Sequence, residues 1–297
     1  MINRLLDISE NVVFDEPMSA HTSFRIGGNA DAFASVKGAE EVKALSSFCK
    51  KNGIPYMFMG NGSNMLVSDK GIRGLVIQIG SGMQSCEIEG ETVYAEAGIL
   101  MSKLAKAMLR AELSGFEALS GIPGTLGGGI YMNAGAYGGE IKDIAAEITY
   151  IDNDGNIKTI SGAEADFSYR HSIFEEKGYI ILSAKLKLEK GKYDDIKAAM
   201  DDYNKRRADK QPLNMPSAGS TFKRPEGYFA GKLIQDCGLM GYSVGGAQVS
   251  EKHAGFVVNK GGATAQEVLS LIEHIQNTVR ERFGVELSPE VRLIGEF

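Results

Sequence analysis

The residues with the clearest chemical meaning form a glycine-rich run, GIPGTLGGGIYMNAGAYGGE, from Gly121 to Glu140. Eight of its twenty residues are glycine, although each interior glycine costs roughly 0.5–1 kcal/mol relative to alanine. A backbone that passes close to a ligand and offers its amides to a diphosphate would offset that cost. Glycine also marks ordinary turns. Tyr131, Asn133 and Tyr137 favour a binding site, because a linker is richer in serine, proline and charge.

A second candidate loop is Gly60-Asn61-Gly62-Ser63-Asn64. Its residues tolerate positive φ and carry small hydroxyl and amide groups, which suits a turn that holds a phosphate. Taken alone, this pattern fits an ordinary turn as well.

Several common sites are excluded by spacing. Gly227 to Lys232 approaches a phosphate-binding P-loop but has the wrong spacing and ends at Leu233 instead of Ser or Thr. No G-x-G-x-x-G follows the first strand, so a dinucleotide held in the Rossmann manner is not expected. Ser220 lies in no G-x-S-x-G elbow. No metal-ligand spacing, and therefore no metal, is expected around the four histidines, which are His21, His171, His253 and His274.

Composition limits the class of protein. A chain of 297 residues predicts about two domains, and its formal charge of −6 lacks the basic stripe of a nucleic-acid binder. The N-terminal segment has no apolar run, which predicts neither a signal peptide nor a membrane span. Three widely spaced cysteines, Cys49, Cys86 and Cys237, favour a cytosolic protein with buried thiols and no zinc site.

The elements needed to position these residues follow from periodicity. The first part of the chain predicts a strand to Val36, a helix over 40–51 stopped by Gly53, and a strand over 54–59. Further segments are strands over 75–79, 86–88 and 92–96, a helix over 101–111, a hairpin over 147–160, a strand over 179–188 and a helix over 193–207. The proline-bearing link after that helix suggests a domain boundary.

In the last part of the chain, Thr264 and Glu267 form a capping box that starts a long helix closed by Gly284. Its expected core face is Val268, Leu271, Ile272, Ile275, Val279 and Phe283. A final strand is predicted over 287–294, with Pro289 near its start.

Seven motifs occur in the order seen in one enzyme family: HTSFRIGG, GNGSNMLV, SGIPGTLGGGIYMNAGAYGGE, YRHSIF, PSAGSTFKRP, SEKHAGFVVN and PEVRLIG. The chain therefore resembles the UDP-N-acetylenolpyruvoylglucosamine reductase family from about His21 to Gly295. The spacing between YRHSIF and PSAGS resembles the shorter subtype, which lacks a tyrosine-bearing loop over the substrate. Arg224 stands where relatives often carry Asn, and His253 where some carry Gln.

The resemblance implies an α+β protein with an FAD-binding fold of the vanillyl-alcohol oxidase type. The FAD-binding region would cover residues 1–205, in subdomains of about 1–72 and 73–205, followed by an α+β substrate domain over 206–297. The implied activity is cytoplasmic: NADPH reduces non-covalently bound FAD, and UDP-N-acetylglucosamine enolpyruvate then becomes UDP-N-acetylmuramate for peptidoglycan synthesis. Partners are the UDP-sugar and NADPH, with no nucleic acid and no membrane.

Site residues are carried over from the matching motifs. Ser220 is implied as the proton donor, assisted by Arg170 and Glu290. Implied FAD contacts are Gly60, Asn61, Gly62, Ser63, Asn64, Gly121, Ile122, Pro123, Gly124, Thr125, Gly128, Ala134 and Gly135. Implied substrate contacts are Tyr137, Tyr169, Lys223 and Arg224. Two alternatives remain: a flavoenzyme of this fold that oxidises an alcohol or lactone, and a flavin-binding module without catalysis.

Overall fold

The computed structural model describes residues 2–297 and divides into two compact units. Unit 1 contains the chain up to Val13, Phe33–Asn61 and Leu75–Arg207, and unit 2 contains Phe14–Ala32, Gly62–Gly74 and Ala208–Phe297. The division falls within three strands of one sheet, β1 (Val12–Pro17), β2 (Asn29–Ser35) and β5 (Ile72–Gln78). Each unit is therefore assembled from segments that are distant in the sequence.

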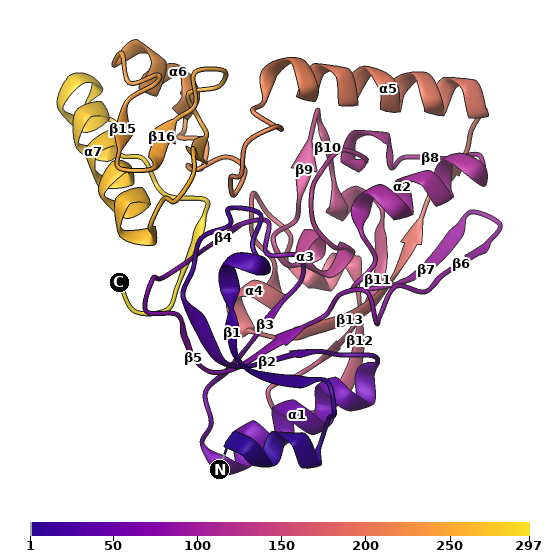
Figure 1. The fold of residues 1–297 in the computed structure, drawn as a ribbon. Helices are drawn as coiled ribbons and strands as arrows, with labels where there is room; N and C mark the ends of the chain where they lie inside the picture. Colours follow the sequence, from indigo (N-terminus) through magenta and orange to yellow (C-terminus); the bar gives the residue numbers. More distant parts are fainter. Residues whose placement is uncertain (1) are drawn as a thin grey trace. The chain divides into compact units, whose positions relative to one another are not determined.

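The expected strand, helix, strand order is present in unit 1 (Figure 1). Helix α1 (Ala39–Asn52) buries Val42, Leu45 and Cys49 and ends at Gly53, whose φ of 64° allows the left-handed cap. Strand β3 (Tyr56–Met59) pairs in parallel with β5. The strand begins at Tyr56 and not at residue 54, because the Ile54 amide donates to Cys49 O at the helix end and Pro55 has no amide hydrogen.

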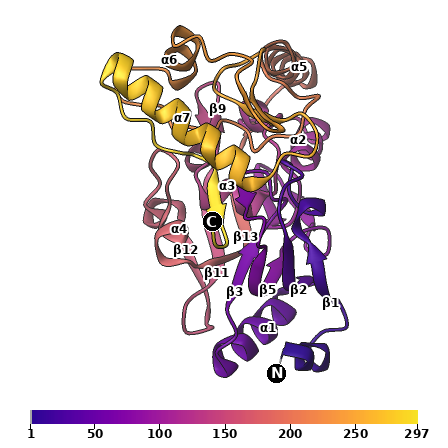
Figure 2. The ribbon, with the colours of Figure 1, turned by 60° about the vertical axis from the view of Figure 1, so that its left-hand side comes forward.

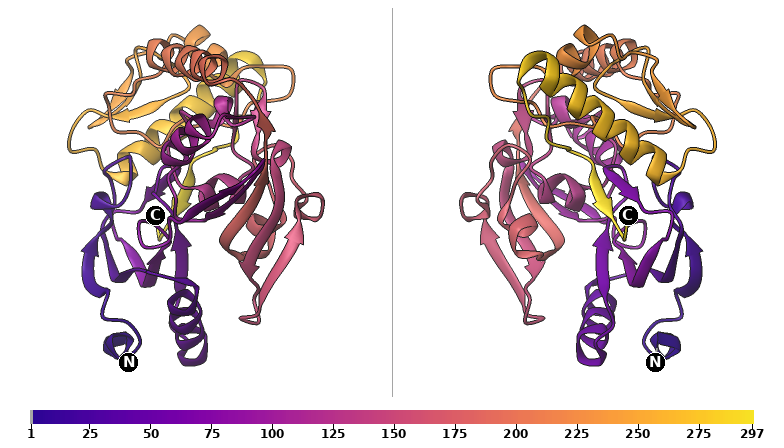
Figure 3. Two further views of the ribbon diagram at one scale, coloured as in Figure 1. Left: turned by 90° about the vertical axis from the view of Figure 1, so that its right-hand side faces the viewer. Right: turned by 90° about the vertical axis from the view of Figure 1, so that its left-hand side faces the viewer.

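A five-stranded antiparallel sheet forms the larger layer of unit 1, in the order β12 (Ile157–Ser161), β11 (Ala145–Ile151), β13 (Ile180–Lys187), β7 (Thr92–Glu96), β6 (Cys86–Glu89). Ile148 is opposite Ile160 on one side and Ala184 on the other. The pink strands of this sheet are seen side by side in Figure 3. The predicted hairpin is confirmed, with Asp152 Oδ1 accepting from the amides of Asp154 and Asn156 at 2.9 Å.

Short elements complete unit 1. Helix α2 (Met101–Arg110) buries Met101, Leu104 and Met108. The remaining helices are α3 (Leu126–Tyr131), α4 (Ile173–Lys177) and α5 (Tyr193–Lys210). The short strands pair as β9 (Gly135–Ala136) with β10 (Gly139–Glu140) and β8 (Leu113–Ser114) with β14 (Glu189–Lys190). Short 3₁₀ helices are η1 (Ile2–Asp7), η3 (Glu117–Leu119), η4 (Ile141–Asp143) and η5 (Gly162–Ala165).

In unit 2, helix α7 (Ala265–Phe283) packs against β15 (Ser243–Val244), β16 (Ala247–Val249) and α6 (Ala230–Asp236) (Figure 2). The predicted capping box is confirmed: Thr264 Oγ1 accepts from Glu267 N at 3.1 Å, and Glu267 Oε2 accepts from Thr264 N at 3.0 Å. Strand β17 (Val257–Asn259) pairs with β16, β18 (Arg292–Ile294) pairs in parallel with β4 (Met65–Val67), and η2 (Met18–Ala20) precedes the loop to β2.

Three details differ from the sequence predictions. The final strand is shorter than 287–294, because Pro289 makes only an isolated bridge to Phe222 before β18 starts at Arg292. Phe283, the last residue of α7, is 38% exposed instead of buried. Cys49 is buried as expected, whereas Cys86 and Cys237 are only half-buried. No helix among residues 2–297 has both the length and the hydropathy to cross a membrane.

Candidate active site

The two glycine loops approach each other closely within unit 1. A Cβ on Gly60 would lie 2.3 Å from Thr125 Oγ1, so only glycine fits at that position. Thr125 is buried and caps α3, where its Oγ1 accepts from Gly128 N at 3.4 Å. The start of the first loop is thereby held against the start of the α3 helix.

The glycines of α3 have two different roles. A Cβ on Gly127 would lie 2.8 Å from Ala97 Cβ, so this glycine allows the helix to pack on the chain that leaves β7. A Cβ on Gly128 would meet nothing closer than Thr125 Oγ1, at 3.6 Å, and Gly128 is exposed. Part of the glycine density therefore serves packing, and only part leaves backbone open to a ligand.

An open cavity of about 430 Å³ lies beside these loops, within the size range of small-molecule sites. It brings together five of the expected cofactor-binding residues, Asn61, Gly121, Ile122, Pro123 and Gly124. Leu100, Ser102, Ala105, Lys106, Ser120, Met200 and Asn204 also line it.

Two buried polar atoms have no hydrogen-bond partner among residues 2–297: Ser120 Oγ, in the wall of this cavity, and Arg207 Nε, beside the lining residue Gly121. Ser120 lines the cavity, and a Cβ on Gly121 would lie 2.9 Å from Arg207 Nε. Arg207 is only 9% exposed, and burial lowers the pKa of its guanidinium. Because an unsatisfied buried donor costs about 1–3 kcal/mol, this pair points to a polar ligand.

Sequence reasoning did not select Arg207, although a signal was present. Arg207 follows the buried residues Ile196 and Met200 at helical spacing along α5. A basic side chain on the buried face of a helix is unusual, and that position could have marked it as functional.

Asn133 fixes the loop that carries Arg170. Its Nδ2 donates to Ser168 O at 3.0 Å and to Glu140 Oε2 at 3.0 Å, and its Oδ1 accepts from Lys142 N at 3.0 Å. On the other side of Arg170, Ser172 Oγ donates to Tyr131 O at 2.7 Å. The glycine-rich run therefore holds this loop on both sides of Arg170.

Arg170 adopts a positive φ of 54°, and its Nη2 donates to Gly135 O at 3.2 Å. Its guanidinium also lies 5.1 Å from the centre of the Tyr169 ring. Although burial acts to raise the pKa of Glu140, hydrogen bonds from Lys142 and Asn133 and the charge of Arg170 hold it below the ordinary value. Arg170 thus lies beside an ionised carboxylate and a backbone carbonyl.

Tyr137 stands at the tip of a two-residue hairpin turn. Tyr137 and Gly138 both have positive φ, 53° and 90°, between the paired strands β9 and β10. That is the type I′ arrangement, which normally selects Asn or Gly. The Tyr137 ring stacks on Tyr203 of α5 with 4.8 Å between the ring centres. A bulky residue in this conformation strains the backbone.

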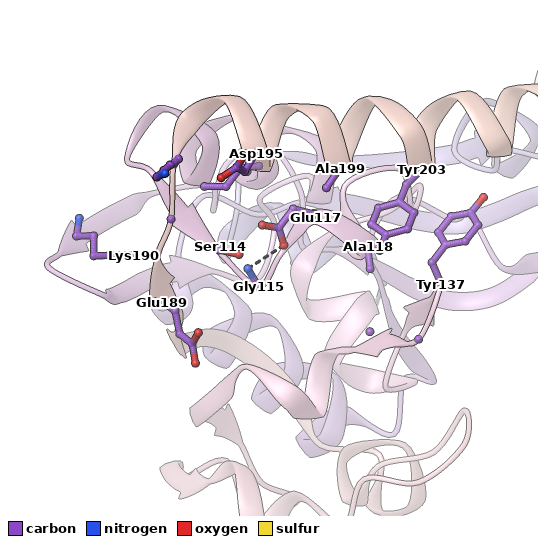
Figure 4. A pocket seen from close by; sticks show the side chains of 15 residues that line it. Ser114, Gly115, Glu117, Ala118, Tyr137, Glu189, Lys190, Asp195, Ala199 and Tyr203 are labelled. Carbon is purple, nitrogen blue, oxygen red and sulfur yellow. Dashed lines mark hydrogen bonds between the residues drawn. The ribbon is translucent and has the colours of Figure 1, made fainter.

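Figure 4 shows a second cavity of unit 1, about 580 Å³, with the Tyr137 and Tyr203 rings on its wall. Glu117 lies in the same wall, and its Oε2 accepts from Gly115 N at 2.8 Å. Tyr137 is the only expected site residue among those that line this cavity.

In unit 2, Thr221 joins the segments that carry Ser220 and Glu290. Its carbonyl accepts from Glu290 N at 2.8 Å, and its Oγ1 accepts from Val257 N at 2.9 Å. Thr221 is buried, whereas Ser220 is exposed. Lys223 N donates to Ser288 O at 2.9 Å, which continues the pairing. The serine and the carboxylate are therefore on adjacent, firmly held segments.

The second half of the first loop lies in unit 2. Gly62 O accepts from Ser23 N at 3.2 Å, and Asn64 Nδ2 donates to Glu290 O at 3.0 Å. The expected catalytic residues divide in the same way, because Arg170 belongs to unit 1 and Ser220 and Glu290 belong to unit 2. Of the other expected contacts, Thr125, Gly128, Ala134, Gly135 and Tyr169 are in unit 1 and Ser63, Lys223 and Arg224 are in unit 2.

The fold also assembles a group that spacing did not suggest. Asp166, His171 and Glu176 each offer one ligand atom, and these atoms lie within 4.8 Å of one another. Lys177 Nζ already pairs with Glu176 at 2.6 Å, and His171 Nδ1 lies 3.3 Å from Glu175 Oε2. Glu176 and His171 thus already have partners within the chain, and we assign the group no ion.

Comparison with family models matches both regions of the chain. Residues 30–161 match the FAD binding domain, and residues 211–294 match the C-terminal domain of UDP-N-acetylenolpyruvoylglucosamine reductase. The expected fold class is confirmed, and so is FAD as the cofactor.

Similar proteins cover the full chain. The UDP-N-acetylenolpyruvoylglucosamine reductase of Caldanaerobacter subterraneus subsp. tengcongensis is 51% identical over 100% of this chain and 98% of its own. That of Clostridioides difficile is 52% identical over 97% and 94%. The crystal structure of the enzyme from Thermus caldophilus has a TM-score of 0.82 at 34% identity and covers 96% of this chain and 98% of its own. The chain therefore belongs to the UDP-N-acetylenolpyruvoylglucosamine reductase family.

Proposed function

We propose that this protein uses NADPH and bound FAD to reduce UDP-N-acetylglucosamine enolpyruvate to UDP-N-acetylmuramate, in the cytoplasm, during peptidoglycan precursor synthesis. The names of relatives that are 51–52% identical over almost their whole length support the substrate. The hydrogen bond from Glu290 N to Thr221 O, which brings the Ser220 and Glu290 segments together, is the observation that supports the proposed proton transfer.

The residues of unit 1 fit FAD. Gly60 leaves no room for a side chain beside Thr125, Gly121 lies against Arg207, and Gly128 exposes backbone. Ser120 Oγ and Arg207 Nε are buried atoms in need of a partner. These two atoms, with Asn61 and Gly121–Gly124 around the adjoining cavity, would hold part of the cofactor. The loop of Gly62, Ser63 and Asn64 in unit 2 and residues Thr125, Ala134 and Gly135 in unit 1 would supply further contacts.

The chemistry that bound FAD would supply is a two-electron transfer from NADPH to the substrate, with the hydride going from N5 to C3 of the enol ether. Negative charge then develops at C2 and on the neighbouring carboxylate. The Arg170 guanidinium would stabilise that charge in the transition state more than in the ground state. The Ser220 hydroxyl would donate the proton to C2, assisted by Glu290. Tyr137, Tyr169, Lys223 and Arg224 would bind the sugar nucleotide.

The deciding experiment is a single-turnover comparison of wild type and Ser220→Ala. NADPH should bleach the flavin of the variant at the wild-type rate, because the hydroxyl takes no part in that half-reaction. Reoxidation by the enolpyruvyl substrate should slow by about 10²-fold or more, as expected for loss of a positioned acid.

Ser288→Ala is the matched control, since Ser288 is an exposed serine on the paired segment and contributes its backbone carbonyl there. It should reoxidise like wild type. Normal reoxidation of Ser220→Ala would remove the serine from the mechanism, and a wild-type protein that leaves the enolpyruvyl substrate unreduced would refute the proposed function.

A further inference from the structure

An exposed aromatic ring and a guanidinium are stacked in unit 2, a few residues after Ser220. The Arg224 Cζ atom lies 3.9 Å from the centre of the Phe229 ring. Phe229 is 61% exposed, the largest fraction among the exposed large apolar residues described. Since the guanidinium covers one face of the ring, the exposed area is on the opposite face and edge.

The segment around this ring is ordered by local contacts. Arg224 Nε donates to Tyr228 O at 3.4 Å, and Tyr228 N donates to Pro225 O at 3.1 Å. Immediately after Phe229, Ala230 is buried and begins α6. The ring is therefore held in solvent by a structured turn. A bulky apolar side chain in that position gives up the free energy that burial of its surface would contribute.

The same segment is close to Ser220 in the fold. Thr221 N donates to Gly255 O at 2.8 Å. A Cβ on Gly231, in the first turn of α6, would lie 3.3 Å from Gly255 N. Gly255 therefore contacts both the backbone beside Ser220 and the first turn of α6, which follows Phe229. Lys223 and Arg224 lie on the chain between these two points.

We infer that Phe229, supported by Arg224, is the stacking surface for the pyrimidine base of the sugar-nucleotide substrate. This inference rests on the proposed function, in which the reacting carbon lies at Ser220. The base is at the far end of that substrate, beyond the sugar and the diphosphate, so a base-binding surface should be near Ser220 but separate from it. The basic pair Lys223 and Arg224 occupies the intervening chain, where the diphosphate charge would lie.

The chemistry of the pair suits a nucleobase. Every base has a flat π-face that stacks on aromatic side chains, and an arginine on the far side of the ring adds cation–π stabilisation. An alternative occupant is the adenine of NADPH, and the two nucleotides can be separated by measurement.

The test is calorimetric titration of the FAD-loaded enzyme with UDP. Phe229→Ala and Phe229→Leu should both weaken UDP binding by roughly 5- to 150-fold, the range for loss of one base stack, because neither retains a π-face. Phe229→Tyr, which retains it, should bind UDP within about twofold of wild type. Phe229→Leu also keeps the apolar bulk, which guards against a loss caused by misfolding alone.

Tyr242→Ala is the matched control, since Tyr242 is another exposed aromatic of unit 2, stacked on His274 with 4.4 Å between the ring centres. It should leave UDP affinity unchanged. UDP binding by Phe229→Ala at wild-type affinity would overturn the inference, as would a defect confined to the KM for NADPH. If the wild-type enzyme reduces the enolpyruvyl substrate in those cases, the proposed function stands and only the base-stacking role fails.

Discussion

Asn133 Nδ2 donates a hydrogen bond to the backbone carbonyl of Ser168 at 3.0 Å and so connects the glycine-rich run to the loop of Arg170. The same amide group donates to Glu140. Asn133 itself is fully buried with a φ of 43°. One side chain thus fixes the backbone on which the proposed charge-stabilising arginine is mounted.

Asn133→Ala should lower the free energy of unfolding by about 1–3 kcal/mol, since buried partners lose their hydrogen bonds. It should also slow flavin reoxidation by the enolpyruvyl substrate, because Arg170 loses its anchor. Denaturant unfolding and stopped-flow absorbance measure the two effects. Asn153→Ala is the control: its Nδ2 also donates to a backbone carbonyl, that of Lys177, but at the surface. Lower stability with unchanged reoxidation would mean that Asn133 does not position Arg170.

Gly127→Ala should affect stability, whereas Gly128→Ala should affect FAD binding. A methyl group at Gly127 would lie 2.8 Å from Ala97 Cβ, so that variant should lose stability by about 1–3 kcal/mol through overpacking. Gly128 has room for the methyl group, and alanine favours a helix. Gly128→Ala should therefore be as stable as wild type but release FAD more readily, as measured by the 450 to 280 nm absorbance ratio. Equal FAD retention in Gly128→Ala and wild type would argue against cofactor contact there.

Arg207→Met should weaken FAD binding by about 10- to 150-fold, the equivalent of the roughly 1.5–3 kcal/mol of a hydrogen bond to a charged group. The far-UV circular dichroism should stay unchanged, because methionine fills a similar volume without a buried charge. Arg206→Met is the matched control on the same helix, since Arg206 is exposed and pairs with Asp202 at 2.8 Å. If both variants retain FAD equally well, the buried guanidinium does not contact the cofactor.

His253 should make stability depend on pH below neutrality. Burial lowers the pKa of its imidazole, and its Nδ1 accepts from Gly255 N at 3.1 Å, which requires the neutral ring. The unfolded chain binds a proton near the ordinary pKa of about 6.5, so it holds more protons than the folded state. Stability should therefore fall as pH drops from about 7 toward the lower folded pKa. His253→Gln should flatten that slope in thermal unfolding, and an unchanged slope would contradict the burial effect.

Local signals explain what could be predicted from sequence. Thr264, Glu267 and an apolar face at helical spacing predict helix α7. The turn residues predict the β11 and β12 hairpin. These features depend on neighbours within a few positions. The prediction that failed at Phe283 concerned a helix end, where spacing alone does not determine burial.

Long-range contacts explain what was missed. Arg207 is functional in our proposal because it is buried beside Gly121, which is far away in the sequence. Asn133 matters because Ser168 lies next to it in the fold. Motif resemblance could supply Ser220, Arg170 and Glu290, but not Thr221, whose carbonyl accepts from Glu290 N and so joins two of those segments.

The hairpin tip at Tyr137 also bears on how the sequence can change. Glycine or asparagine at that turn position would relieve backbone strain, by about 1–2 kcal/mol in the case of glycine, but would lose the stack on Tyr203. Selection for an unstrained turn alone would therefore replace this tyrosine. The tyrosine should persist in a laboratory population screened for growth and be lost in one screened only for soluble expression. That outcome would reveal a position where the stability of the turn has been exchanged for an aromatic ring.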